Sequence, residues 1–414
     1  MADTQSTNSG QISCRTPPLA DVVSTQIDLE KLPTDNHFPE GGTNGLVDGP
    51  RRFFSVFCSF GWANAIGVVQ DYYETHQLKH LSSSTIGWIA SLQLFFFVGR
   101  LFDVAGPRYL FIIGTVLEVL GLMMTSICSK YGEFLVCQGI ITPIGAAFIF
   151  YTALAAVPTH FHRKRGLAMG LSSSGSSLGG TIFPIMVKKL SQTISYGWTM
   201  RACAFLILGL LVMLVLLLRP MQHTKDSKKF ASMTTRSILQ IVLVVASMLT
   251  FWGLFIPIDF VTTAARHYNI SDDMATYLIS ILNGASVVSR IVTGYIDDHA
   301  GRHNVNTIGI LTAGILTLAM WIPSTKLAQL IVYSVIYGFA SVQSFLSVQH
   351  AARRFRNFAA LIGIPIAGAI IGDGSKQARW QGMMAFAGEL IVLGSALQWC
   401  GRVMKVGWSL RKIF

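Results

Sequence analysis

Long apolar runs recur along the chain from Phe53 onward and are separated by short polar gaps. A helix needs about 20 apolar residues to cross the ~30 Å hydrocarbon core of a bilayer. Only 13% of the 414 residues are charged, and a soluble protein with so little charge would leave large apolar patches in water. We therefore expect an all-α multi-pass membrane protein with twelve transmembrane helices, at 53–73, 85–102, 109–127, 134–157, 167–187, 198–218, 237–263, 275–296, 306–323, 327–349, 358–372 and 381–401.

The longest polar gap between spans holds five basic residues and separates the sixth span from the seventh. The first 50 residues are rich in Thr, Ser, Asp, Asn, Gly and Pro, and they hold too few apolar side chains to order themselves. We expect five parts, which are a disordered cytoplasmic tail at 1–50, an N-terminal six-helix bundle at 51–218, a cytoplasmic linker at 219–236, a C-terminal six-helix bundle at 237–401 and a basic cytoplasmic tail at 402–414.

Basic residues set the expected orientation, because Lys and Arg favour the cytoplasmic side of a membrane. With both termini inside, 20 of the 32 basic residues fall in cytoplasmic segments and 8 fall outside. The same orientation places the sequon Asn269-Ile270-Ser271 outside, between the seventh and eighth spans, so Asn269 is a candidate glycosylation site. We expect a multi-pass protein of the plasma membrane.

One short motif occurs twice, after the second span and after the eighth. The copies at Gly99–Arg108 and Gly294–His303 align with a constant offset of 195 residues. Glycine lets a helix end approach its neighbour closely, and an Asp can cap a helix or pair with an Arg. Two related halves are typical of rocking transporters, so we expect these loops to gate the cytoplasmic side through Gly99, Arg100, Asp103, Gly106, Arg108, Gly294, Asp298, Gly301 and Arg302.

The first copy of this motif resembles the signature loop of the major facilitator superfamily. Six further stretches resemble the monocarboxylate porter branch, in particular its fungal members, and they are Pro39–Gly42, Phe60–Trp62, Ile66–Val68, Ser84–Ile89, Arg163–Gly170 and Gly175–Gly180. The resemblance implies twelve helices around a central cavity and alternating access. Members of the branch carry small carboxylates with protons, and fungal relatives are proposed to move secondary metabolites.

Arg290 is the main candidate for substrate binding. It lies about 15 residues, or roughly 22 Å, from the outer end of the eighth span. A guanidinium at this depth usually faces a cavity or a partner, and its planar fork fits a carboxylate. In the family that the chain resembles, an Arg at this place is thought to hold the substrate carboxylate. The alternative is a structural Arg that extends towards the cytoplasmic end.

Two departures from the family pattern weaken the argument that this chain couples transport to protons. An Asp is usual four residues before this Arg, where this chain has Ser286, and a Lys is usual in the first span, where this chain offers Asn64. Asp259 is a substitute acid, but the helical rise places it about 15 Å from Arg290 along the membrane normal.

Other polar residues in the spans have two interpretations. Asn64, Gln93, Tyr151 and Asn283 lie in expected cavity helices, where they either bind substrate oxygens or join helices. Glu118 and Glu389 lie in peripheral helices and are interpreted as protonated or packing groups. From this set we select Asn64, Tyr151 and Asn283, together with Arg290, as substrate-binding candidates.

Two spans are short. The eleventh has 15 residues, or about 22 Å, and the proline that the offset of 195 places at 379 occurs at Pro365 instead. The second span also lacks a few residues before Gly99. Either neighbouring helices and a thinner bilayer compensate, or coding sequence is missing, or the protein does not function.

Other function classes lack their usual signatures. The six cysteines show no metal-site spacing, no nucleophile–base pair or phosphate loop indicates an enzyme, and the scattered basic residues do not favour nucleic acid. We expect no cofactor, and the expected partners are a small-molecule substrate and membrane lipids. The sequence predicts a secondary active transporter of a small organic anion or carboxylated metabolite. The alternatives are an efflux pump without proton coupling and a membrane receptor that does not transport.

Overall fold

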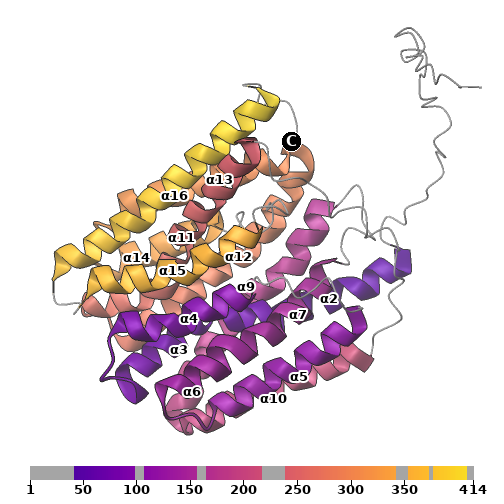
Figure 1. Cartoon of the computed structure of the whole chain (residues 1–414), viewed down its shortest axis with the longest axis vertical. Coiled ribbons are helices and arrows are strands. Elements are labelled where there is room, and N and C mark those ends of the chain that lie inside the picture. The colour runs from indigo at the N-terminus through magenta and orange to yellow at the C-terminus, as the bar shows by residue number, and fades with distance from the viewer. Residues whose placement is uncertain are drawn as a thin grey trace, which may run out of the picture. The chain divides into compact units, whose positions relative to one another are not determined.

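The computed structural model describes residues 42–97, 107–155, 165–216, 238–341, 353–372 and 376–407, and within these ranges it is helical without strands (Figure 1). A helix satisfies its own backbone hydrogen bonds, which lipid cannot do, and this is why the apolar runs fold in this way. Among the described residues, seven helices are long and apolar enough to cross a membrane. The shorter apolar helices lie at 109–125, 327–341 and 362–371. The predicted all-α multi-pass fold of two six-helix bundles is confirmed.

In the N-terminal half, each predicted span corresponds to one helical rod as far as the chain is described. The first rod is interrupted after Ala63 and continues as α3 and the π-helical turn η2, and the fourth contains the π-helical turn η4. The elements are α2 (Gly42–Ala63), α3 (Ile66–Tyr72), η2 (Tyr73–Gln77), α4 (Ser83–Phe97), α5 (Pro107–Thr125), α6 (Tyr131–Val136), η4 (Cys137–Ile141), α7 (Thr142–Ala155), α9 (Arg165–Thr193) and α10 (Tyr196–Leu216).

The C-terminal half repeats this arrangement. Its rods are α11 (Ile238–His267), α12 (Asp272–Ala300), α13 (Arg302–Leu316) with η6 (Thr317–Trp321), α14 (Leu327–Ser341), α15 (Arg353–Ile371) and α16 (Gln377–Val406). Buried polar side chains join three of them. The Asn306 amide donates to Gln398 over 2.9 Å, and the Gln398 amide donates to Thr250 over 3.3 Å, which connects α13, α16 and α11.

The two halves meet along three helix pairs, which are α9 with α12, α4 with α15, and α3 with α11. We call this contact region the seam. Glycine makes its closest approaches possible. A Cβ atom added at Gly170 of α9 would lie 2.2 Å from the carbonyl oxygen of Arg290, and one at Gly294 of α12 would lie 2.6 Å from that of Gly166. In the second pair, the Ser84 hydroxyl donates to the Pro365 carbonyl over 3.2 Å.

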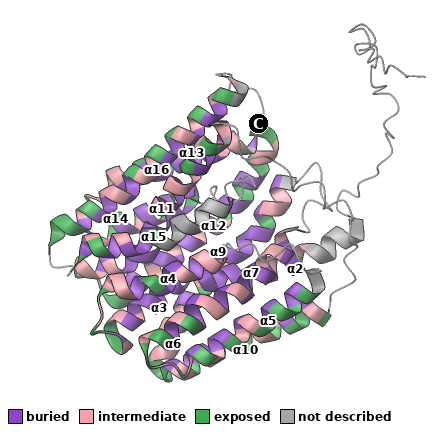
Figure 2. Cartoon of the chain, viewed as in Figure 1, coloured by how far each residue is buried: buried purple, intermediate pink, exposed green. Residues whose placement is uncertain are grey.

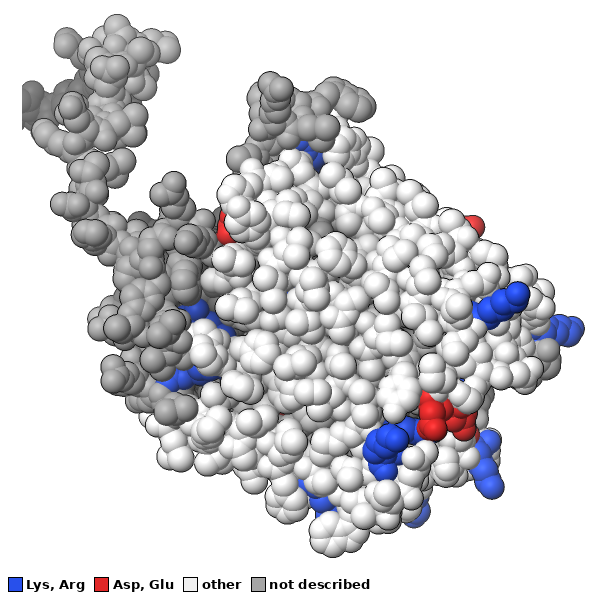
Figure 3. Space-filling model, turned by 180° about the vertical axis from the view of Figure 1, so that it is seen from behind, with Lys and Arg blue, Asp and Glu red and all other residues white. Residues whose placement is uncertain are grey.

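Exposed positions, drawn green in Figure 2, recur along helices such as α5 and α10, and many of them are apolar. Examples on α5 and α10 are Val116, Leu120, Phe205, Val212 and Leu216. The face seen in Figure 3 is uncharged across its middle, and its Lys, Arg, Asp and Glu side chains lie nearer the edges. An apolar surface of this kind is stable against lipid chains rather than water.

Several helix ends differ from the expected bounds. Helix α2 begins at Gly42, inside the segment expected to be a tail, whereas residues 1–41 and the linker lie outside the described residues. Helix α15 begins at Arg353, which gives it 19 residues, or about 28 Å, because a polar turn precedes its apolar run. Helix α16 continues to Val406 because Arg402 is buried, donates to Asn304 and lies 5.0 Å from the ring centroid of Trp399.

The packing of α9 against α2 predicts a contrast between two glycines. A Cβ at Gly175 would lie 2.1 Å from the Phe53 carbonyl oxygen, whereas one at Gly209 of α10 would meet nothing within 4 Å. Gly175→Ala should destabilise the protein by about 1–3 kcal/mol through overpacking, and Gly209→Ala should be neutral or slightly stabilising. Thermal unfolding of the detergent-purified variants measures both, and equal melting temperatures would contradict the close approach of α9 to α2.

Candidate functional site in the seam

Arg290 lies in the interior of the seam. Its side chain is buried, and Nε donates to the hydroxyl oxygen of Ser177 on α9 over 2.7 Å. Further along the same pair, Thr181 and Ser280 each donate a hydroxyl to the other's carbonyl oxygen, at 3.4 and 3.2 Å. The guanidinium of one half is therefore held by a hydroxyl of the other half.

Asn64 and Asn283 are brought together beside Gly180 of α9. A Cβ at Gly180 would lie 2.8 Å from the amide group of Asn283 and 2.8 Å from Cβ of Asn64. Both amides are buried. Asn64 donates to the Ser176 carbonyl over 3.3 Å, and Asn283 donates to Ile279 in its own helix over 3.0 Å. Asn283 and Arg290 are seven residues apart, so they share one face of α12.

Tyr151 lies in a different environment. It is half-buried on α7, and its ring meets that of Phe150 edge to face with centroids 5.6 Å apart. Helix α7 packs on α2, α4 and α5 of its own half. The role of Tyr151 in substrate binding stays a prediction.

The second copy of the repeated motif closes one end of the seam. This end, where α9 begins and α12 ends, is called the motif end, and the opposite one is the far end. The carboxylate of Asp298 accepts the backbone N–H of Gly166 at 2.6 Å and that of Leu167 at 3.0 Å. It thus caps the first turn of α9 from the other half of the protein. Gly301 turns the chain between α12 and α13 with a φ of 83°, which favours glycine.

The remaining motif residues are described in part or not at all. Gly294 packs directly against Gly166. The backbones of Arg108 and Arg302 are helical, and nothing is described of their side chains. Gly99, Arg100, Asp103 and Gly106 lie outside the described residues. The gating role of the nine residues stays a prediction.

The far end of the seam is joined by a pair that the sequence analysis missed. Asp71 of the first rod forms an ion pair with Arg266 near the end of α11, and Arg266 Nε also lies 2.9 Å from a carboxylate oxygen of Asp272. Asp71 and Arg266 are 195 residues apart, which is the offset of the repeat. The two halves therefore pair equivalent positions that carry opposite charges.

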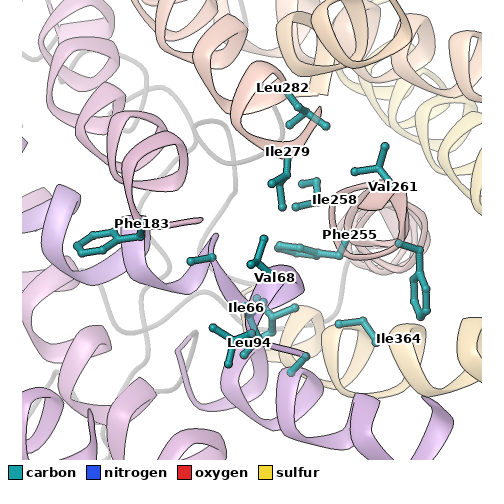
Figure 4. Packing of buried hydrophobic residues seen from close by; sticks show 14 of the residues in the cluster. Ile66, Val68, Leu94, Phe183, Phe255, Ile258, Val261, Ile279, Leu282 and Ile364 are labelled. Atoms are coloured by element: carbon teal, nitrogen blue, oxygen red, sulfur yellow. The ribbon is translucent and has the colours of Figure 1, made fainter. Parts of the chain in front are cut away.

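Between these two ends the seam also contains buried apolar side chains, some of which are drawn in Figure 4. The labelled side chains come from α3, α4, α9, α11, α12 and α15, and they are Ile66, Val68, Leu94, Phe183, Phe255, Ile258, Val261, Ile279, Leu282 and Ile364. If the halves separate, side chains such as Val68 of α3 and Phe255 of α11 form part of the wall of the space between them. Such a wall accepts an apolar body, and the polar groups near Arg290 accept a charged end.

Three further acids that lie within spans have different environments. Asp259 lies in the seam on α11 and is 4% exposed. Glu118 on α5 is fully buried within the N-terminal half, beside Gly145 of α7. Glu389 on α16 is exposed at its position in the span. Among the described residues, no group of three or more His, Cys, Asp or Glu side chains is placed to hold a metal.

Two signals in the sequence would have improved the expected site. The serine-rich stretch Ser172–Ser177 in α9 supplies the partners of Asn64 and Arg290. Asp71 was visible as a charge inside an apolar run, and the offset of 195 leads from it to Arg266. Applying the offset to charged residues, and not only to the motif, would have found the far-end pair.

Comparison with known proteins shows the family of the chain. Residues 52–357 match the family model described as Major Facilitator Superfamily. The MFS transporter asaE of Aspergillus flavus is 39% identical over 426 residues, covering 95% of this chain and 96% of the relative. The Fujikurins efflux protein of Gibberella fujikuroi is 37% identical, and the match covers 91% of this chain and 86% of that relative. The Aspyridones efflux protein apdF of Emericella nidulans is 36% identical, and the match covers 75% of this chain and 65% of that relative.

The alignment with the Aspergillus flavus relative spans more positions than the 414 residues of this chain, so it contains internal gaps in this chain. The matched family model covers most of the helices that build the seam, and the relatives extend the similarity over nearly the whole chain. The chain therefore belongs to the major facilitator superfamily.

Proposed function

We propose that this protein is a secondary active transporter that exports a carboxylated metabolite by alternating access, with Arg290 as the carboxylate anchor. The observation that supports it most is the burial of Arg290 between the halves, on the hydroxyl of Ser177. Asn64 and Asn283 lie nearby as donors to substrate oxygens. The motif resemblance supports a place in the monocarboxylate porter branch, and relatives that are named for efflux of fujikurins and aspyridones support export.

The apolar seam supports a substrate with a large apolar body. Buried apolar side chains of the two halves approach one another in the seam, as Val68 of α3 and Phe255 of α11 do in Figure 4. A small hydrophilic acid gains little from such a wall, whereas each apolar Å² that is removed from water contributes about 25 cal/mol. An amphipathic acid therefore fits the wall and the anchor together.

Alternating access requires contacts that break at one end while they form at the other. The cap by Asp298 is the candidate at the motif end, and the pair of Asp71 with Arg266 is the candidate at the far end. We infer from the distribution of basic residues that the motif end and both termini face the cytoplasm. We also infer that the protein lies in the plasma membrane.

Transport by variants of Arg290 tests the anchor. Yeast cells that express the chain are loaded with radiolabelled lactate, benzoate or decanoate, and efflux is followed. We expect benzoate and decanoate to leave faster than from control cells. Arg290→Ala should slow this efflux about tenfold or more, because a hydrogen bond to a charged group is worth about 1.5–3 kcal/mol.

Two comparisons make this result specific. Arg290→Lys keeps the charge without the planar fork and should retain part of the efflux. Arg201→Ala removes a guanidinium that donates to Ser126 inside the N-terminal half, and it should leave efflux unchanged. Equal efflux by wild type and Arg290→Ala would exclude the anchor, and no efflux of any acid by wild type would exclude the substrate class.

Removing the cap should loosen the motif end. Ser173 is buried on the face of α9 that carries Gly166, Gly170 and Ser177, so a cysteine there is reached by N-ethylmaleimide only when the seam opens. In a background without native cysteines, Asp298→Ala should raise the labelling rate of Ser173→Cys about 5–30-fold, which corresponds to about 1–2 kcal/mol. Asp273→Ala, an exposed acid at the start of α12, is the control, and an unchanged rate for Asp298→Ala would contradict a gating contact.

Glycosylation tests the orientation. Asn269 is exposed in the turn between α11 and α12 at the far end, with a φ of 59°. If this end faces the lumen of the endoplasmic reticulum during synthesis, protein expressed in yeast should migrate faster in gel electrophoresis after endoglycosidase H treatment. Asn269→Gln should remove this difference in migration. A wild-type band that the enzyme does not shift would count against the use of this sequon.

A further inference from the structure

Asp259 is a buried acid to which the proposed function assigns no role. It lies inside α11, is 4% exposed, and among the described residues its Oδ2 has no hydrogen-bond partner. Burying an ionised carboxylate without a donor is strongly unfavourable. Burial of this kind favours the protonated form of a carboxyl group.

The position of Asp259 makes its burial depend on closure of the seam. Helix α3 of the other half crosses α11 at this residue, and a Cβ at Gly67 would lie 3.3 Å from the carbonyl oxygen and 3.4 Å from Cα of Asp259. Its neighbours Ile258 and Val261 belong to the apolar cluster of Figure 4. Separation of α3 from α11 would admit water to the carboxylate.

The repeat places Asp259 at the position equivalent to a candidate site residue. Asn64 lies 195 residues before Asp259 in the sequence. Asp71 and Arg266 are related by the same offset and lie seven residues further along the same helical rods, towards the far end. Helix α11 continues to His267, so Asp259 is eight residues, or about 12 Å, inside the far end. Arg290 is 18 residues inside α12, and the two groups are separated by about 15 Å along the axis.

The charged and titratable groups on the helices around Asp259 have other partners or face elsewhere. On α14, the Tyr337 hydroxyl lies close enough to Asp259 to interact electrostatically, and it donates to the Leu254 carbonyl over 2.8 Å. On α3, Asp71 pairs with Arg266. On α12, Arg290 donates to Ser177. The described side chains of α15, at 362–371, include no titratable group, and Glu389 of α16 is exposed.

We propose that Asp259 is the proton-binding site that couples transport, and that only its protonated form allows the far end of the seam to close. The direction in which protons and substrate move in this inference rests on the proposed function. With the far end open, the carboxylate takes a proton from hydronium on that side. After the far end closes and the motif end opens, water that enters from the motif end takes the proton, the substrate carboxylate binds at Arg290, and the ionised Asp259 then favours reopening of the far end.

Coupling of this kind needs no contact between the two sites. The proton and the substrate each change the free energy of closing the seam, and this shared step links them. It also removes the difficulty that the residue one turn before Arg290 is Ser286 and not an acid. The acid is supplied by another helix, at another level of the same seam.

The test measures the far end directly and needs no substrate. Spin labels are attached at Lys79→Cys and Lys326→Cys, two exposed positions at the far ends of the two halves, in the full-length protein without its native cysteines, reconstituted in lipid nanodiscs. Double electron–electron resonance gives the distance between the labels from about pH 5.5 to about pH 9, a range that brackets neutrality and in which a buried carboxyl group can titrate. In wild type, the long-distance population should grow as the pH rises, because loss of the proton from Asp259 disfavours closure.

Substitutions at Asp259 should change this response in a defined way. Asp259→Asn mimics the protonated acid, so the short distance should dominate at every pH, and Asp259→Glu should keep a pH response. Glu118→Gln is the matched control, since Glu118 is another buried acid without hydrogen-bond partners among the described residues but lies within one half. It should behave as wild type. Asp71→Asn should lengthen the distance overall and still respond to pH.

Four results would overturn the proposal. They are a wild-type distance that is independent of pH, a pH response that survives in Asp259→Asn, loss of the response in Glu118→Gln, and loss of the response in Asp71→Asn. The first three remove Asp259 as the sensor, and the last assigns the response to the far-end pair. A response that depends on Asp259, without efflux of any tested acid, would support the proton site and reject the proposed substrate class.

Discussion

The approach of α9 to α12 is the contact on which the arrangement of the seam depends. Gly166, Gly170 and Gly294 leave no room for a side chain between the two backbones. Once the helices lie at this distance, residues at successive turns on one face of α12 contact α9. Asn283, Arg290, Gly294 and Asp298 are spaced by seven, four and four residues, which is the repeat of a single helical face. The amide, the guanidinium, the close contact and the helix cap are thus consequences of one packing geometry.

The pseudo-symmetry of the halves explains the far-end pair. A two-fold axis brings equivalent positions face to face, so a residue near the axis meets its own counterpart in the other half. Identical carboxylates there would repel. In this chain the counterpart of Asp71 is Arg266, and the counterpart of the neutral Asn64 is the acid Asp259. Divergence between the two halves has therefore placed opposite charges at one pair of equivalent positions, and an amide and an acid at another.

Hydropathy predicted the helical rods and the division into two halves, because lipid imposes a length and a composition on every span. It misplaced ends such as His267 and Val406, because a helix continues through polar residues once neighbouring helices bury them. The seam burial of Arg290 agrees with its predicted depth. The pairing of Asp71 with Arg266 was not predicted, since hydropathy does not determine how each helix is rotated about its axis. The role of Tyr151, and that of the first motif copy at 99–106, remain predictions from resemblance.

Charge burial gives a reason for separating the anchor from the proposed proton site. The seam closes over a guanidinium at Arg290 and a carboxyl group at Asp259, and closure over an ionised group costs free energy unless its charge is compensated. A substrate carboxylate adds an opposite charge at the first group, and a proton neutralises the second. If the two groups were paired directly, each would compensate the other and closure would respond to neither ligand. Their separation along the seam lets each ligand lower the cost of closure on its own, so the substrate acts in the outward step and the proton in the return step.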